Sequence, residues 1–453
     1  MKKLFTALLL LGGIALAGPP QAVAIRNARI VTVSGPAIAK GTVVLRNGLI
    51  EAVGENVAVP ADAWVVDGEG MTVYPGLVDA MSTIGIPSLA QAAGATGGRG
   101  AGRGQAGAQP TPAPRSMGPE DRPQTTSWVL AADEIQTGDP RIAAARSEGF
   151  TTAFTFPQRG IFGGQGSAID LGDAEKTGEL VVVPALGQWT SVGRGGFGFG
   201  GGFPSALMGY ISYIRQLYLD ADHYRLLKEA YAKDPRGMAR PEYDRALEGL
   251  LASQRILMPA NRVVEMDRML RFAAELKQPV ILYGMREGYR PGAAELVKKY
   301  NAPVLVSLRW SEPPRDPNPE QEQSLRSLED IDLGPSTPAL LKKAGVPFAF
   351  YADGLDQPRD LQRAIKRAMQ AGLSREDVIR ALTLAPAEIY NLADRLGSIE
   401  KGKIANLVVT KGELFDDNTR IQMVFVDGRQ YKPAPEMPAG GRGGMITAPG
   451  VEK

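Results

Sequence analysis

Residues 73–83 read VYPGLVDAMST, and the apolar segment within them, residues 76–80, is predicted to be a short strand. Further short apolar segments follow, with helical stretches between most of them. The predicted strands are 76–80, 151–156, 180–185, 255–258, 279–283, 302–308 and 346–351, and the predicted helices are 140–147, 263–276, 292–300, 337–344, 361–371 and one that begins at Ser374. Such alternation is typical of a parallel sheet with crossover helices. The fold class is therefore predicted to be α/β, with a TIM-like (β/α)8 barrel over residues 71–395.

The chain on either side of the barrel has another texture, with apolar residues in short runs. Asn47-Gly48 separates two such runs, and Asn-Gly in this position is a strong hairpin signal. Similar runs return after residue 405. We therefore expect residues 25–70 and 396–432 to form one small composite β-sandwich domain from both ends of the chain.

Length and charge narrow the choice of function. At 453 residues the chain has room for a barrel, which usually takes about 250 residues, and for a smaller domain. Its 51 Lys and Arg nearly cancel its 49 Asp and Glu, and the net charge of +2 creates no strong field for nucleic acid or acidic lipid. We therefore expect no nucleic-acid partner.

Three segments contain too little apolar surface to offset the entropy cost of ordering. They are a flexible insertion at 87–125, a glycine-rich stretch at 193–204 and a flexible tail at 433–453. Arg-Gly repeats in the insertion also occur in RNA-binding segments, but the nearly neutral charge favours a flexible loop. The Leu- and Tyr-rich segment 210–254 is predicted to form extra helices over the barrel's rim.

The N-terminus has the features of a secretory signal peptide. Two lysines precede an apolar run that ends in Ala-Leu-Ala, so residues 1–17 are predicted to be removed, with cleavage after Ala24 as the alternative. The run is shorter than the roughly 20 residues needed to span a bilayer. The chain has no cysteine for a disulfide or for lipid attachment. We expect an exported protein, periplasmic or secreted, without membrane association after cleavage.

Several motifs, taken in order, resemble those of the amidohydrolase superfamily, in its exported, imidazolonepropionase-like branch. The stretch quoted first resembles the Pro-Gly-Leu-Ile-Asp that opens the family's first barrel strand and leads into His-x-His. Further resemblances lie at 149–152, 164–168, 258–261, 343–347, 381–387 and 396–408. The resemblance implies a metal-dependent-hydrolase barrel with a composite β domain, and a hydrolase of non-peptide carbon–nitrogen bonds.

The resemblance also implies metal ligands that this sequence does not supply. Family members hold Zn or another divalent metal with histidines, but Met81 and Thr83 stand at the first histidine pair and Pro259 at a mid-barrel histidine. A thioether is a poor zinc ligand, a neutral hydroxyl donates weakly, and proline has no side-chain donor. The single histidine of the chain, His223, lies beside acids in the helical segment, where we expect a surface residue without catalytic role. No metal cofactor is therefore expected.

Asp353 alone matches a functional position of the family intact. At the mouth of a barrel it could act as a general acid or base. Alternatively it has a structural role, capping the next helix or pairing with Arg309. Tyr283, Arg286, Arg309 and Trp310 also follow predicted strand ends and are candidates to line a binding pocket, although surface loops hold such residues as often.

Three functions are compatible with these observations. The first is a hydrolase of carbon–nitrogen bonds with an altered or metal-free mechanism, including a Mg or Ca site made of oxygen ligands from Asp353 with Asp356 or Asp79. The second is a pseudoenzyme, a non-catalytic barrel that assembles as a homo-oligomer or with an intact related amidohydrolase. The third is a sensor of a small-molecule ligand. The ligand chemistry favours the second.

Overall fold

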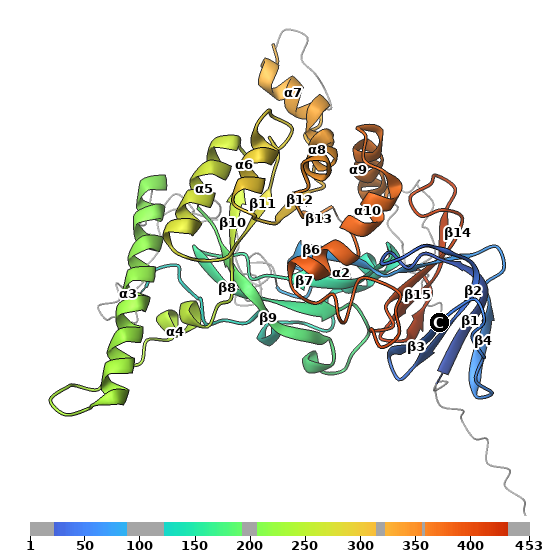
Figure 1. Cartoon of the computed structure of the whole chain (residues 1–453), viewed down its shortest axis with the longest axis horizontal. Coiled ribbons are helices and arrows are strands. Elements are labelled where there is room, and N and C mark those ends of the chain that lie inside the picture. Colours follow the sequence, from blue (N-terminus) through green and yellow to red (C-terminus); the bar gives the residue numbers. More distant parts are fainter. Residues whose placement is uncertain (1–21, 88–121, 193–205, 314–321, 356–357, 434–453) are drawn as a thin grey trace, which may run out of the picture.

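The computed structural model describes residues 22–87, 122–192, 206–313, 322–355 and 358–433 (Figure 1). The predicted signal peptide, the predicted glycine-rich stretch and nearly all of the predicted insertion and tail lie outside these residues. Two eight-stranded sheets organise the described chain, a composite sheet at one end of the molecule and a barrel sheet surrounded by helices. None of the helices in the described segments has the length and apolar composition of a membrane span.

Both ends of the described chain contribute strands to the composite sheet. Its strands are β1 (Ala22–Ile30), β2 (Ile38–Arg46), β3 (Leu49–Gly54), β4 (Ala63–Asp67), β5 (Thr72–Pro75), β14 (Leu407–Lys411), β15 (Arg420–Val426) and β16 (Arg429–Tyr431). They run in the order β16-β15-β14-β5-β1-β2-β3, and β4 pairs with part of β1. β5 joins the two ends, because it pairs parallel to β1 and antiparallel to β14. The predicted composite domain is confirmed.

One turn and one boundary of this sheet bear on the sequence predictions. Asn47 and Gly48, between β2 and β3, have φ angles of 51° and 78°, as a tight Asn-Gly hairpin requires. The boundary predicted after residue 70 is wrong, because β5 lies inside the composite sheet and the barrel begins with Leu77. All four residues of β5 are buried, and a short apolar run reads equally well as a barrel strand.

The barrel sheet contains the predicted strands in sequence order. They are β6 (Leu77–Ser82), β7 (Phe150–Thr155), β9 (Val181–Thr190), β10 (Ile256–Ala260), β11 (Val280–Gly284), β12 (Val304–Ser307) and β13 (Phe348–Tyr351). All of these run parallel to one another. Inward side chains such as Leu257, Ile281 and Leu305 form a buried interior cluster. The predicted barrel fold is confirmed.

An additional strand, β8 (Phe162–Asp170), lies between β7 and β9 and runs antiparallel to both. Antiparallel neighbours need no crossover helix, so this part of the barrel departs from strict (β/α)8 alternation. The sequence does not predict β8 because it is rich in glycine, a residue depleted from strands. Gly166 has a packing reason, since a Cβ there would lie 2.2 Å from the ring of Phe156.

The barrel is nearly closed, and its first and last strands, β6 and β13, are the two ends of the hydrogen-bonded ladder. Asp79 of β6 bridges this seam, because its Oδ1 accepts a hydrogen bond of 3.1 Å from the backbone N–H of Ala352, directly after β13. The N–H of Val78 donates to the carbonyl of Leu382 at 2.7 Å. Single polar contacts therefore connect β6 to the last part of the barrel.

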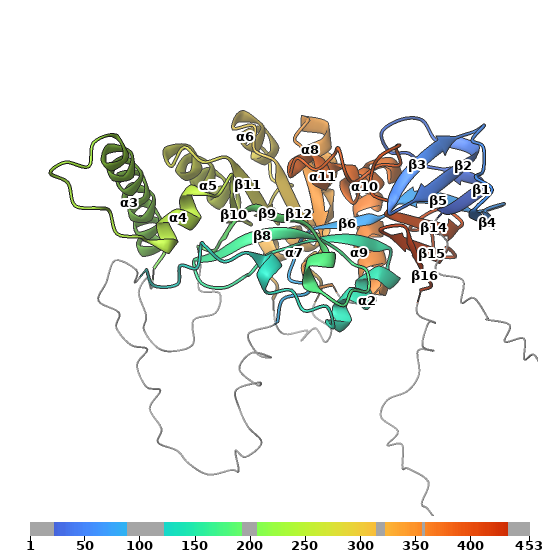
Figure 2. The same ribbon diagram turned by 90° about the horizontal axis from the view of Figure 1, so that it is seen from below.

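Helices surround the barrel sheet (Figure 2). They are α2 (Pro140–Ser147), α5 (Val263–Glu275), α6 (Ala293–Lys299), α7 (Leu325–Leu333), α8 (Thr337–Ala344), α9 (Pro358–Gln370), α10 (Arg375–Ala381) and α11 (Leu384–Ile389). The predicted extra helices are α3 (Leu207–Lys233) and α4 (Arg245–Leu251), which lie far from the composite sheet. α7 was not predicted; it buries none of its residues and is held by polar contacts such as Arg326–Glu287.

The last residues of the predicted flexible insertion, 122–125, are packed instead of flexible. Arg122 forms ion pairs with Asp220 of α3 at 2.6 Å and with Asp244, the N-cap of α4, at 3.0 Å. Thr125 is buried and bridges to Phe162 of β8. These partners are distant in sequence, so local composition places the end of the insertion too late.

Candidate functional site

The carboxyl ends of parallel strands meet at one edge of a barrel, where functional groups gather. We call the side chains Met81, Pro259, Tyr283, Ser307 and Asp353 the barrel mouth, because each ends or follows one of these strands. Pro259 and Tyr283 are direct neighbours in the β10–β11 ladder. Ser307 is likewise paired with Tyr351, two residues before Asp353. The register therefore assembles the mouth from four adjacent strands and from β6.

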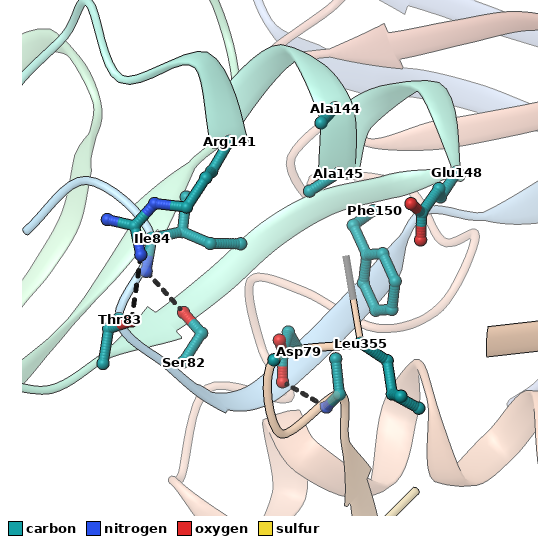
Figure 3. A pocket seen from close by; sticks show the side chains of 12 residues that line it. Asp79, Ser82, Thr83, Ile84, Arg141, Ala144, Ala145, Glu148, Phe150 and Leu355 are labelled. Atoms are coloured by element: carbon teal, nitrogen blue, oxygen red, sulfur yellow. Dashed lines mark hydrogen bonds between the residues drawn. The ribbon is translucent and has the colours of Figure 1, made fainter. Parts of the chain in front are cut away.

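The two positions at the end of β6 have structural partners. Met81 is 4% exposed and packs in the interior cluster of the barrel. Thr83 accepts a hydrogen bond of 3.1 Å from the guanidinium of Arg141 on α2 (Figure 3). Arg141 is held in turn by Asp139 at 2.7 Å. Met81 thus serves as a core side chain and Thr83 as an anchor for α2.

Tyr283 spans the neighbouring strand ends. Its hydroxyl donates a hydrogen bond of 2.8 Å to the backbone carbonyl of Thr190, at the end of β9. Its ring stacks on Trp189, with 6.4 Å between ring centroids. Burial raises the pKa of Tyr283 far above its ordinary value, and the nearby charge of Asp353 raises it further. Tyr283 is therefore a neutral phenol and a hydrogen-bond donor.

Asp353 has the unusual backbone φ of 52°. Its Oδ2 accepts a hydrogen bond of 2.7 Å from the hydroxyl of Ser307, and that hydroxyl oxygen accepts from the backbone N–H of Arg309 at 3.0 Å. Burial, and then the charge of Asp353, raise the pKa of the Tyr351 hydroxyl. The carboxylate is thus fixed beside two neutral phenols, where it can accept hydrogen bonds from a ligand or take up a proton.

The structure separates the remaining binding candidates. Arg309 is exposed. Among the described residues its guanidinium donates to the carbonyl of Gly354 at 2.9 Å, rather than to Asp353. Trp310 is 9% exposed, and its indole N–H donates to the carbonyl of Ala364 at 2.9 Å. Arg286 is exposed. Only Tyr283 joins Asp353 in the barrel mouth, whereas Arg309 and Trp310 face a neighbouring cavity.

A separate cavity of about 250 Å³, the seam pocket, lies between β6, α2 and the chain after β13 (Figure 3). Its lining includes Asp79, Ser82, Thr83, Arg141, Glu148 and Phe150. Asp79 is 3% exposed and accepts from the N–H groups of Ala352 and Met81, so it positions backbone across the seam. The quoted stretch contains Asp79, but only the fold reveals the bridging role.

His223 lies on α3, outside the barrel mouth. It borders a cavity of about 520 Å³ together with Arg122, Tyr224 and Asp244. Among the residues that the structure describes, no three His, Cys, Asp or Glu side chains are grouped so that they could hold a metal ion. Asp356, named as an oxygen ligand for Mg or Ca, lies outside the described residues.

The chain is similar to known amidohydrolases. The family model described as the amidohydrolase family matches residues 335–431. A solved structure of an amidohydrolase from Thermotoga maritima MSB8 is 27% identical, with a TM-score of 0.70, and the match covers 90% of this chain and 100% of that chain. The family-model match and this solved structure both point to the amidohydrolase family. The family-model match spans α8 through β16, and so includes Asp353 and the return to the composite sheet.

More distant structures share the fold of this chain. A molinate hydrolase is 16% identical with a TM-score of 0.51, over 95% of this chain and 99% of that chain. A prolidase complexed with N-methylphosphonate-L-proline is 16% identical with a TM-score of 0.53, over 91% of this chain and 99% of that chain. No curated protein matches the chain.

Proposed function

We propose that this amidohydrolase-family protein does not hydrolyse a ligand through a metal-bound water and instead uses its barrel mouth to bind a small molecule. The donor set of the mouth is the observation that supports this most strongly. Met81 is packed in the core, Pro259 has no side-chain donor, and the hydroxyl of Tyr283 is engaged by Thr190. Asp353 is the only group of the barrel mouth with the chemistry of a strong metal ligand.

The family's metal does not fit these residues. A catalytic zinc site takes three protein ligands, usually histidines with a carboxylate or thiolate, and leaves one position for water. The whole chain has one histidine and no cysteine. That histidine, His223, borders a cavity on α3. Ligation by Tyr283 would require loss of its proton, which its raised pKa opposes.

A metal-free hydrolase is the closest enzymatic alternative, because Asp353 has the position of a general base. Structures that share the fold include a molinate hydrolase and a phenylurea hydrolase B, which suggests molinate and phenylureas besides amides, hydantoins and dipeptides as trial substrates. We expect the purified protein to turn over none of them above the buffer rate, with or without a chelator. Activity lost on chelation would overturn the proposal. Activity that survives chelation and is lost in Asp353→Asn, but not in the exposed control Asp222→Asn, would establish the metal-free hydrolase.

Assembly is a second candidate function, favoured by an apolar stripe on α3. Met208, Leu219 and Leu226 are 82%, 57% and 54% exposed, and their spacing places them on one face of the helix. The stripe would pack against a second copy or against an intact related amidohydrolase. Light scattering of the wild type and of Leu219→Glu/Leu226→Glu tests it. A wild-type monomer that also fails to co-purify with such a relative would exclude this role.

We also propose export, on the basis of residues 1–17. The fold favours cleavage after Ala17 over cleavage after Ala24. The later cut would remove the first three residues of β1, which are buried and pair with both β2 and β4. N-terminal sequencing of protein recovered from the periplasm or the medium should therefore begin at Gly18. A start at Ile25 would contradict the choice of site, and intact Met1 in retained protein would contradict export.

A further inference from the structure

A cavity of about 300 Å³ opens between the end of β12 and helix α9. We call it the arginine pocket, because its lining includes Arg309, Arg363 and Arg367, with Leu308 and Trp310 as apolar neighbours. The carbonyl of Gly354, the residue after Asp353, accepts a hydrogen bond from Arg309. The pocket therefore adjoins the barrel mouth on the side of the last barrel strand.

The charges in this pocket are not balanced locally. Its two acidic residues, Glu312 and Asp360, both pair with Arg363, at 2.9 Å and 3.1 Å. Arg309 and Arg367 form no ion pair with any described residue within 4.0 Å. One arginine thus takes both carboxylates, and two arginines are left with neutral partners.

Those neutral partners are backbone carbonyls. Arg367 donates to the carbonyls of Ser311 at 3.1 Å and of Ile331 at 2.6 Å, and Arg309 donates to that of Gly354. Burial lowers the pKa of Arg367, and the nearby charges of Glu312 and Asp332 only partly oppose this. The carbonyl contacts fix both guanidinium groups in place before any ligand arrives, which reduces the entropy cost of binding.

The guanidinium of Arg309 lies close to the backbone at Gly354. A Cβ at residue 354 would stand 3.2 Å from the Nη2 atom of Arg309, and the φ of Gly354 is +71°, which few other residues adopt. Trp310 forms a rigid wall of the pocket, because its indole N–H donates a hydrogen bond to the carbonyl of Ala364. A guanidinium group has five N–H donors in a planar fork, and Arg309 uses one of them in the described contacts.

We propose that the arginine pocket binds the anionic group, carboxylate or phosphate, of a small molecule that also reaches Asp353. Fixed guanidinium groups recognise both anions through paired, charge-assisted hydrogen bonds. Barrel proteins frequently hold phosphate at the loops that follow their last two strands, and β12 and β13 are the last two here. The inference rests on the proposed binding function, because the anionic group belongs to the small molecule that the barrel mouth binds. The affinity of the pocket for an anion follows from its charges alone.

Calorimetric titration of the mature protein with inorganic phosphate and, separately, with acetate tests the inference. We expect saturable binding of at least one of the two anions, weakened about tenfold or more in Arg309→Gln and partly restored in Arg309→Lys. Arg236→Gln is the matched control, because the Arg236 side chain is 90% exposed. The tighter of the two anions identifies the ligand group.

Localisation of the signal gives a second readout. The indole N–H resonance of Trp310, assigned with Trp310→Phe, should shift with the anion in the wild type and not in Arg309→Gln. No saturable binding of either anion, or equal binding by wild type and Arg309→Gln, would overturn the inference. A metal found in the barrel mouth would contradict the proposed function but leave these titrations unchanged, so the two failures are distinguishable.

Discussion

The bodies of the barrel strands and their carboxyl ends follow different rules. In the bodies Leu257, Ile281 and Leu305 point inward and are buried, as the interior of any such barrel requires. At the ends, Met81 and Pro259 stand where the family resemblance implies histidines. Packing of the strand bodies therefore stabilises the fold, and the side chains at the strand ends can change without loss of the barrel.

The largest effect on stability is expected from a buried side chain in a strand body. Phe154 of β7 is fully buried and meets Tyr390 edge to face, with ring centroids 4.8 Å apart. Phe154→Ala should lower the free energy of unfolding by about 3 to 5 kcal/mol, because it leaves a cavity in the interior cluster. Urea denaturation measures this. The control Leu325→Ala, at a residue 72% exposed, should change the free energy of unfolding by about 0.5 kcal/mol or less, and equal effects of the two variants would contradict the role given to the strand bodies.

A buried carboxylate lies at the opposite edge of the barrel. Asp170 ends β8, whose reversed direction carries it away from the barrel mouth toward the composite sheet. Its Oδ1 accepts from Asn406 at 2.7 Å and from Thr152 at 3.0 Å. Burial raises the pKa of Asp170 to about 7, and these two hydrogen bonds only partly oppose the rise. Here a strand end carries a carboxylic acid that connects two domains.

The sign of the pH effect follows from linkage. The pKa of Asp170 is about 7 in the folded state and about 4 in the unfolded chain, so the folded protein binds more protons between these values. Stability should therefore fall as the pH rises from about 4 to about 7, by a few kcal/mol at most. Asp170→Asn should flatten this fall and be more stable than wild type at pH 8, whereas the exposed control Asp173→Asn should not. An unchanged pH profile in Asp170→Asn would contradict the assignment.

The smallest effect is expected in the barrel mouth itself. Tyr283→Phe removes the hydrogen bond to Thr190 and should cost about 1 kcal/mol of stability. The loss should be local, without change in the binding of phosphate or acetate. Tyr243→Phe, at a residue 67% exposed, is the control. Comparison of thermal unfolding of the two variants at one pH provides the measurement, and a loss several times larger would show that the mouth stabilises the fold.

The sequence predicts the strands whose local pattern is sufficient. Short apolar runs predict β10, β11 and β12, because a parallel strand that is buried on both faces carries apolar side chains on both. β8 does not follow this pattern, because the close contact with Phe156 requires glycine at residue 166, and glycine does not favour strands. α7 escapes it because polar contacts with the loop after β11, such as Glu329–Arg290 at 3.0 Å, hold it in place.

The barrel mouth is less predictable than the fold. The sequence alone identifies Met81 and Pro259 as unsuitable ligands, because side-chain chemistry needs no coordinates. It does not reveal that Ser307 donates to Asp353, or that Arg309 turns away toward Gly354, because such contacts depend on strand register and on the backbone conformation of the turn. Side chains at one strand end, such as Ser307 and Arg309, thus divide between the barrel mouth and the arginine pocket.

Elemental analysis of natively purified, unchelated protein shows directly whether the barrel mouth holds a metal ion. We expect far less than one equivalent of zinc, manganese or nickel per chain, the same in wild type and in Asp353→Asn. One tightly held transition metal per chain, reduced in Asp353→Asn, would contradict it.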